Sequence, residues 1–227
     1  MDYESFYTEL KDRAMVEGMI LFGVGSLEKV RSSFHPALEG IGGQFERAIS
    51  IGYRLPDVVI EEIKDRPTLL YASAYKTANW LLDQTAARLA ALIHRAGGTA
   101  VPIAASQIVD WDEQLGHMSH KLMGREAGHG WIGKSGLLVN PVHGARVRYA
   151  TVLTDVPLPL DAPIEGGCGE CRICIDMCPA GAISEDGYDR DSCLEKLKSF
   201  RSIRGIGHYI CGVCVKACPV GTGKTEL

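Results

Sequence analysis

The chain has 227 residues, of which 46% are hydrophobic and 23% are charged, and its formal net charge is −4. This balance is typical of a globular protein and argues against a dedicated nucleic-acid-binding or anionic-membrane surface. No apolar run reaches the roughly 20 residues that a membrane-spanning helix needs. The first residues, Met1 to Glu4, are polar and acidic, unlike a signal peptide, so we expect a cytoplasmic protein.

Helical and extended patterns alternate over the first 160 residues. We expect helices at residues 3–17 and 77–95; in the second, Leu82, Ala86 and Leu89 recur on one face. Short apolar runs predict strands at residues 19–24, 48–53, 100–105, 137–139 and 147–153. This alternation predicts a mixed α/β domain over residues 1–160.

The cysteines define a second domain. Three prolines between Asp155 and Pro163 predict a stiff linker, and all eight cysteines follow it, between Cys168 and Cys218. A disulfide scaffold of a secreted protein would spread its cysteines over the chain, so a local metal site in a reducing compartment explains them better. We therefore predict a metal-binding domain at residues 161–227.

The first cysteine motif has the spacing of a bacterial two-cluster ferredoxin. It reads Cys168-x2-Cys171-x2-Cys174-x3-Cys178-Pro179. In such a motif the first three thiolates hold one [4Fe–4S] cluster, and the fourth ligates the other cluster. A pair of zinc sites is the competing interpretation, but zinc accounts neither for the fourth cysteine nor for the proline after it.

The second motif repeats only the last three positions, as Cys211-x2-Cys214-x3-Cys218-Pro219, with His208 where a first cysteine would stand. Cys193 lies outside both motifs and is the natural replacement, and nitrogen ligation by His208 is the alternative. The motifs thus predict two [4Fe–4S] clusters. The expected ligands are Cys168, Cys171, Cys174 and Cys218 for the first cluster, and Cys178, Cys193, Cys211 and Cys214 for the second.

The glycine-rich segment Gly128–Ser135 matches two phosphate-binding patterns, G-x-G-x-x-G and G-x4-G-K-S. Both patterns need a strand before them and a helix after them, whereas here a helix-like segment precedes and a strand-like segment follows. An iron–sulfur ATPase, in which Lys134 would bind the phosphates, is therefore the lowest-ranked of three hypotheses about the function. We expect instead a turn whose glycines let the backbone approach a large cofactor.

Several segments together resemble a known family, the epoxyqueuosine reductases, and also the catalytic core of corrinoid-dependent reductive dehalogenases. The segments are Arg125–Lys134, Leu137–Pro141, Val147–Asp155 and the two cysteine motifs. The resemblance implies a nitroreductase-like α/β domain that binds cobalamin in its base-off form. It also implies a ferredoxin-like module whose clusters feed single electrons to the cobalt.

The resemblance also suggests site residues. Those implied for cobalamin are Gly128, His129, Gly130, Gly133 and Lys134. Epoxyqueuosine reductases carry a proton-donating aspartate at a position that falls on Gln114 here, with Asp110, Asp112 and Glu113 close by. The candidate catalytic residues are therefore Glu113 and Tyr149, although Tyr149 is also expected in the core of a strand.

Two functions follow. The first is a cobalamin- and iron–sulfur-dependent reductase, working anaerobically on a small molecule or a modified nucleoside. The second is an electron-transfer protein without a substrate of its own, which reduces a partner such as a corrinoid protein. Either protein needs a low-potential electron donor such as ferredoxin or flavodoxin.

Overall fold

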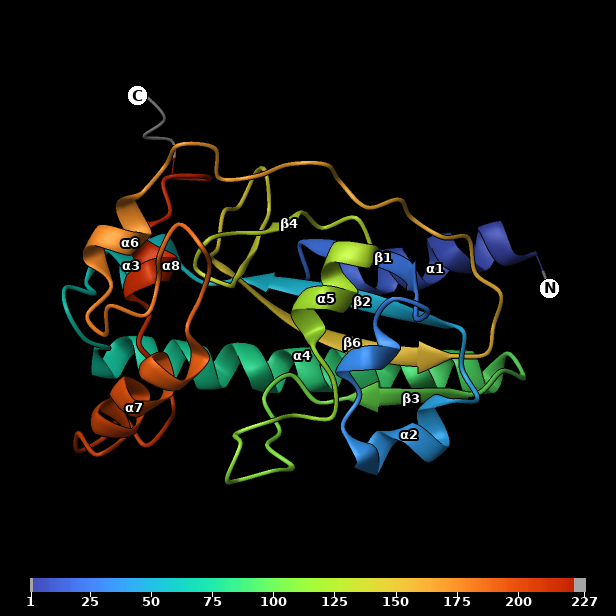
Figure 1. Ribbon diagram of the computed structural model, residues 1–227. Helices are drawn as coiled ribbons and strands as arrows, with labels where there is room; N and C mark the ends of the chain where they lie inside the picture. Colours follow the sequence, from blue (N-terminus) through green and yellow to red (C-terminus); the bar gives the residue numbers. More distant parts are fainter. Residues whose placement is uncertain (1, 223–227) are drawn as a thin grey trace. The chain divides into compact units, whose positions relative to one another are not determined.

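The computed structural model describes residues 2–222, which form two compact units (Figure 1). The first unit consists of the residues up to Tyr53, then Ala78–His129 and Arg148–Ile164. The second consists of Arg54–Thr77, Gly130–Val147 and the residues from Glu165 onward. The division expected at residue 160 lies near the last junction, but the second unit also takes up two earlier segments.

The first unit is built on a four-stranded sheet with the order β1-β2-β6-β3. Its strands are β1 (Leu21–Ser26), β2 (Arg47–Arg54), β3 (Ala100–Ile103) and β6 (Val147–Thr154). β1 is antiparallel to β2, and β3 is antiparallel to β6. Pro102 is tolerated within β3 because this strand forms the edge of the sheet.

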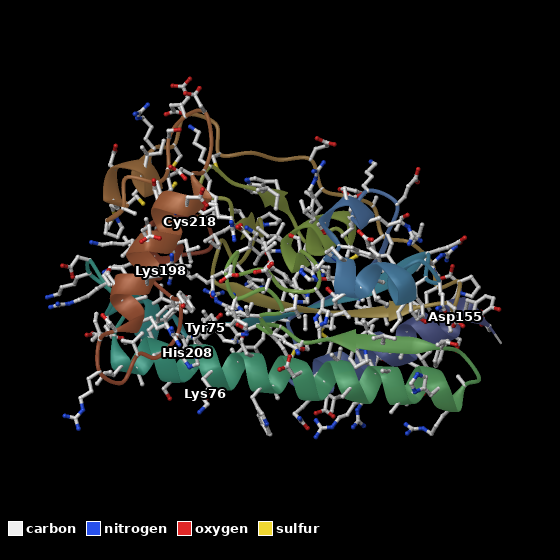
Figure 2. The ribbon with its side chains drawn as sticks, turned by 60° about the horizontal axis from the view of Figure 1, so that its bottom comes forward. Tyr75, Lys76, Asp155, Lys198, His208 and Cys218 are labelled. Carbon is white, nitrogen blue, oxygen red and sulfur yellow. The ribbon has the colours of Figure 1, made fainter. Side chains whose placement is uncertain are left out.

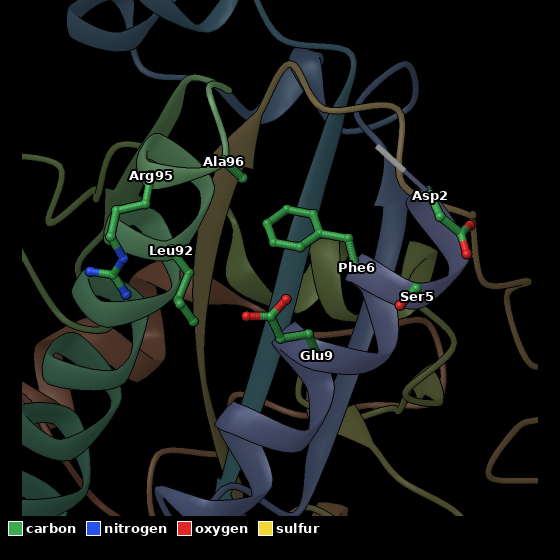
Figure 3. A pocket seen from close by; sticks show the side chains of 7 residues that line it. All are labelled: Asp2, Ser5, Phe6, Glu9, Leu92, Arg95 and Ala96. Atoms are coloured by element: carbon green, nitrogen blue, oxygen red, sulfur yellow. The ribbon is translucent and has the colours of Figure 1, made fainter.

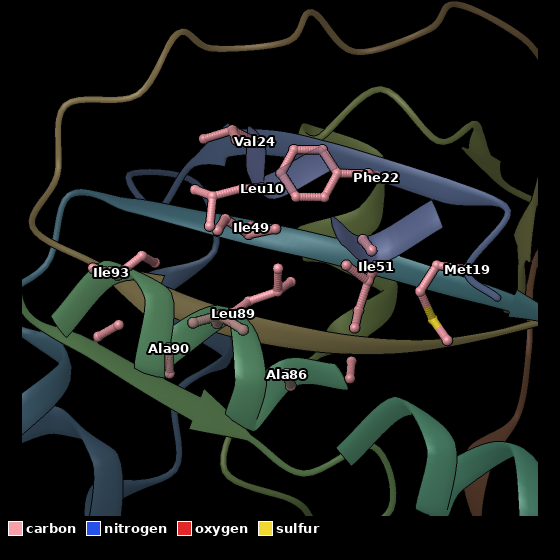
Figure 4. Close-up of a cluster of buried hydrophobic side chains, with 14 of the residues drawn as sticks. Leu10, Met19, Phe22, Val24, Ile49, Ile51, Ala86, Leu89, Ala90 and Ile93 are labelled. Carbon is pink, nitrogen blue, oxygen red and sulfur yellow. The ribbon is translucent and has the colours of Figure 1, made fainter. Parts of the chain in front are cut away.

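Helices cover both faces of this sheet. α1 (Tyr3–Val16) and the residues of α4 (Leu69–Arg95) from Ala78 on pack on one face. There, Leu10 and Leu89 meet Ile49 and Ile51 of β2 in a closed apolar cluster (Figure 4). α2 (Pro36–Gly42) and α5 (His120–Glu126) pack on the other face, and the short helix η1 (Arg31–Ser33) precedes α2. The predicted mixed α/β fold is confirmed.

Two element boundaries differ from the expected ones. β1 begins at Leu21 because the chain after α1 first turns back on the helix: Met19 N donates to Ala14 O at 3.1 Å. α4 begins at Leu69 instead of residue 77. The side chain of Thr68 caps it by accepting the N–H of Tyr71 at 3.0 Å, a helix start that hydrophobic periodicity does not reveal.

The second unit is made of short elements. They are α3 (Asp57–Glu61), the first two turns of α4, the hairpin β4 (Trp131–Ile132) and β5 (Leu138–Val139), α6 (Ile173–Met177), α7 (Arg190–Arg201) and α8 (Val213–Ala217). None of the helices that the structure describes is both long and apolar enough to cross a lipid bilayer.

Arg146 joins these short elements. Its guanidinium is 1% exposed and donates to Asp57 and Glu61 of α3, each at 2.8 Å. Arg54 first, and then Arg146, hold the pKa of Asp57 below its usual value. Lys216 of α8 donates its Nζ to the carbonyl oxygen of Glu61 at 2.8 Å. α3 is therefore tied both to the segment after the hairpin and to the second cysteine motif.

Candidate metal centre

Both cysteine motifs adopt the same local fold. Cys178 (φ −66°, ψ 115°) caps the C-terminus of α6, and Cys218 (φ −66°, ψ 116°) caps that of α8. Each of these cysteines precedes a proline, and the ring of a proline disfavours helical geometry in the residue before it. The two helices pack against each other. The internal repeat that the sequence suggests is therefore present in the backbone.

The eight thiols line two cavities. One, of about 90 Å³, is lined by Cys168, Cys171, Cys174 and Cys218. The other, of about 30 Å³, is lined by Cys178, Cys193, Cys211 and Cys214. The last cysteine of each motif thus lies with the thiols of the other motif. Cys214 contributes to the walls of both cavities, so the two cavities are neighbours.

Electrostatics in the cavities oppose ionisation of the bare thiols. Burial, with a smaller contribution from neighbouring cysteines, raises the pKa of Cys214 to about 12 and that of Cys211 to about 11. Burial also raises the pKa values of Cys174 and Cys218. Four thiolates can share such a cavity only if a cationic core compensates their charge.

Three further observations bear on what fits the first cavity. All eight cysteines are free thiols, and four thiolates around a compact space are the ligand set of a [4Fe–4S] cluster. The indole Nε1 of Trp131, which lines this cavity, is buried and has no hydrogen-bond partner within residues 2–222. In that same range, no group of three or more His, Cys, Asp or Glu side chains is placed to hold a metal ion. The donor set and the orphaned N–H both fit a cluster whose sulfurs accept hydrogen bonds.

Cys193 and His208, the two alternatives for the eighth ligand, occupy different places. Cys193, on α7, lines the second cavity, and Tyr188 hydrogen-bonds to its thiol. The ring of His208 packs on Tyr75 of α4, with centroids 5.9 Å apart (Figure 2). Of the described residues that line the two cavities, Cys193 is one and His208 is not.

The glycine-rich segment contains strand β4 and the first part of the turn that leads to β5. A strand therefore follows it, as the sequence predicts, and the helix N-terminus of a phosphate-binding loop does not. Gly133 approaches the first cavity so closely that a Cβ atom built on it would lie 3.1 Å from Cys168 Sγ. Lys134 Nζ lies 2.7 Å from Glu185 Oε2 and donates to Cys171 O at 3.1 Å.

The other residues implied for cobalamin contact the chain itself. Gly128 (φ +75°) and Gly130 (φ +147°) have room only for hydrogen, because a Cβ atom would meet the carbonyl oxygens of Ala162 and Val139. The imidazole of His129 is 3% exposed, and its Nε2 lies 3.1 Å from Ser50 O. Burial lowers its pKa to about 4, so the ring is neutral at neutral pH.

The candidate catalytic residues differ in burial. Tyr149 is 6% exposed in β6, and its hydroxyl finds no hydrogen-bond partner in the described chain. Burial raises its pKa, so the phenol stays protonated. Glu113 lies in an exposed loop, where its N–H donates to Asp110 Oδ1 at 2.9 Å. Gln114, at the position of the family's aspartate, has left-handed backbone geometry (φ 52°).

The first unit contains a separate open groove of about 420 Å³ between α1 and the end of α4 (Figure 3). Its walls include Phe6, Glu9 and Arg95 and carry no cysteine. None of these positions was predicted as a functional site.

Sequence reasoning missed two partners of the cysteine loops. Glu185 pairs with Lys134, and Tyr188 contacts Cys193. Both follow the first motif closely, but nothing in the local pattern indicates which side chains they meet.

Comparisons with known proteins agree with the motifs. No family model matches the sequence. The epoxyqueuosine reductase of Bacillus anthracis is 35% identical over 117 residues, which is 48% of this chain and 31% of the reductase. The enzyme of Escherichia coli is 36% identical over 107 residues, which is 43% of this chain and 28% of the reductase. The chain thus spans about a third of the length of these curated relatives.

Solved structures share the fold. A catabolic reductive dehalogenase in complex with 3-bromo-4-hydroxybenzoic acid has a TM-score of 0.76 at 22% identity and matches 97% of this chain and 32% of its own. The epoxyqueuosine reductase of Streptococcus thermophilus has a TM-score of 0.66 at 20% identity, matching 94% of this chain and 65% of its own. Over about half of its length the chain is similar in sequence to epoxyqueuosine reductases, and over nearly all of it the chain shares the fold of solved reductive dehalogenase and epoxyqueuosine reductase structures.

Proposed function

We propose that this protein is an iron–sulfur reductase that passes single electrons from two [4Fe–4S] clusters to a corrinoid cobalt. The observation that carries the proposal is the crosswise arrangement of the cysteines, in which the last cysteine of each motif lines the cavity formed mainly by the other motif. The proposed ligands are Cys168, Cys171, Cys174 and Cys218 for the first cluster, and Cys178, Cys193, Cys211 and Cys214 for the second.

The chain's own residues shape this centre. Such clusters, when bound, accept and release one electron at a time, at potentials that depend on hydrogen bonds to sulfur, nearby charge and solvent exposure. Cys214 lines both cavities, so the two ligand sets lie next to each other. Trp131 and Tyr188 offer hydrogen-bond donors, one beside each cavity.

The corrinoid part of the proposal rests on the relatives. The structure of one reductive dehalogenase that shares the fold, with a TM-score of 0.75 at 22% identity, suggests a mechanism for B12-dependent dehalogenation. An epoxyqueuosine reductase with a TM-score of 0.64 has been solved with a modified tRNA stem loop. A halogenated aromatic acid and a modified nucleoside are therefore the two substrate classes to test, with ferredoxin or flavodoxin as the electron donor.

An anaerobic cobalamin titration tests the proposal. The protein is reconstituted with iron and sulfide, its iron content per chain is measured, and cobalamin binding is followed by visible and EPR spectroscopy. A one-to-one complex with a base-off cobalt(II) signal supports the reductase. Two intact clusters without cobalamin binding would instead identify an electron-transfer protein that reduces a separate partner.

A further inference from the structure

We propose that Lys134 and Glu185 form a charge pair that sets the reduction potential of the cluster held by Cys168, Cys171, Cys174 and Cys218. The inference rests on the cluster part of the proposed function and does not depend on the electron acceptor. Gly133 and Lys134, which belong to the segment that matches a phosphate-binding pattern in sequence, thereby have a role at the first cysteine motif.

The lysine is held in place beside the first cysteine motif. Its side chain is 17% exposed, and its Nζ contacts both Glu185 Oε2 at 2.7 Å and the carbonyl oxygen of Cys171 at 3.1 Å. The contacts with Glu185 and with the backbone of Cys171 hold the ammonium group in this position. The ammonium group is therefore a fixed positive charge next to two of the proposed ligands.

The glycine before it makes this position available. Because Gly133 has no side chain, the hairpin turn can lie against Cys168 Sγ. The following residue, Lys134, then reaches the carbonyl oxygen of Cys171 in the same cysteine loop. A bulkier residue at 133 would hold the turn, and its charge, farther from the thiols.

Glu185 moderates this charge. Its carboxylate is 44% exposed and also pairs with Arg172, the residue next to Cys171. The hydrogen bond from Lys134 lowers the pKa of Glu185, so the carboxylate is ionised at neutral pH. Two cations, Lys134 and Arg172, and one anion, Glu185, are thus held by mutual contacts beside the first cysteine motif.

The two side chains should move the potential in opposite directions. Reduction adds a negative charge to a cluster whose thiolates already make it anionic, so a nearby cation favours the reduced state and a nearby anion opposes it. Lys134→Gln should therefore lower the potential of one cluster, and Glu185→Gln should raise it. The double variant should lie between the two, because each charge partly offsets the other.

The experiment is an EPR-monitored redox titration of the reconstituted protein, with iron and sulfide measured for every variant. A change of about tenfold in the one-electron equilibrium corresponds to a shift of about 59 mV. The charge-preserving variant Lys134→Arg should titrate close to the wild type. Arg13→Gln and Glu17→Gln, which disrupt an ion pair of 2.7 Å between α1 and the residue that caps its C-terminus, are the matched controls and should shift neither cluster.

The outcomes separate this inference from the proposed function. Unshifted potentials in Lys134→Gln and Glu185→Gln at full iron content would overturn the inference, as would shifts in the same direction. It would also be overturned if Lys134→Arg behaved like Lys134→Gln, since contact would then matter and charge would not. If Lys134→Gln loses iron, the direction of the shift in Glu185→Gln still decides. A wild-type protein that assembles no cluster would overturn the proposed function itself.

Discussion

Gly133 lies against the thiol of Cys168. A Cβ atom at this glycine would stand 3.1 Å from Sγ and 2.9 Å from Cγ2 of Val139, both closer than ordinary contact. The hairpin turn thus forms part of the wall of the first thiol cavity, and at Gly133 there is no room for a side chain.

Gly133→Ala should therefore weaken the first cluster and spare the second. Relieving the overlap costs about 1–3 kcal/mol, and movement of Cys168 would disturb the ligand set. We expect iron per chain to fall by about half. Gly167→Ala is the matched control, because nothing lies within 4 Å of a Cβ at that position, directly before Cys168. Equal iron in both variants would show that the turn does not bound the cluster.

The eighth ligand can be decided by a pair of substitutions. Cys193→Ala removes a thiol that lines the second cavity, so about half of the iron should be lost. His208→Ala removes a ring that packs on Tyr75, and the iron content should stay at the wild-type level. Iron and sulfide analysis after anaerobic reconstitution gives the answer. The reverse pattern would make His208 the ligand.

Tyr149→Phe should leave the protein as stable as the wild type or slightly more stable. The hydroxyl has no partner in the described residues, so its removal relieves a desolvation cost of up to about 1–3 kcal/mol. Tyr7→Phe is the control: that hydroxyl donates to Asp161 at 2.8 Å, and its loss should destabilise by about 1 kcal/mol. Urea unfolding distinguishes the two variants.

The same Tyr149→Phe variant bears on catalysis. A reductase that loses its turnover without losing stability would have Tyr149 as its proton donor. A clear loss of stability would instead mean that the hydroxyl forms a contact essential to the fold.

Stability should fall on mild acidification because of His129. Burial lowers the pKa of this imidazole to about 4 in the folded protein, whereas the unfolded chain titrates near 6.5. The contribution of His129 to the free energy of unfolding is fully present above pH 6.5. It is lost as the pH falls toward 4, because the histidine then binds a proton in the unfolded chain but not in the folded one. Linkage gives a loss of about 1 kcal/mol between pH 7.5 and 5.5.

Denaturant unfolding at these two pH values measures the effect. His129→Gln cannot take up the proton, so its stability should depend less on pH than that of the wild type, whatever its absolute value. An identical pH dependence in both proteins would mean that His129 is accessible to protons in the fold.

The sequence predicts those features that depend on local spacing. The Cys-Pro pairs dictate where α6 and α8 end, and periodicity identifies the buried face of α4. The contacts of Lys134 could not be predicted, because its ammonium group is equally suited to phosphate, solvent or a carboxylate. Only the fold brings Glu185 to it. The start of α4 was missed for a related reason: Thr68 marks it by a cap, while the apolar pattern begins later.

The cysteine-rich unit is assembled from three separate stretches of chain, and its thiols come last. Trp131, Ser135 and Val139 wall the first cavity, and Glu61 receives Lys216 of the second motif, yet all four precede the linker. A fragment that begins at residue 161 would possess every thiol but only part of the walls around them. Residues 161–227 therefore do not contain the whole unit and cannot be moved into another protein as a complete cluster-binding domain. During synthesis, several residues of the cavity walls leave the ribosome before any of the cysteines.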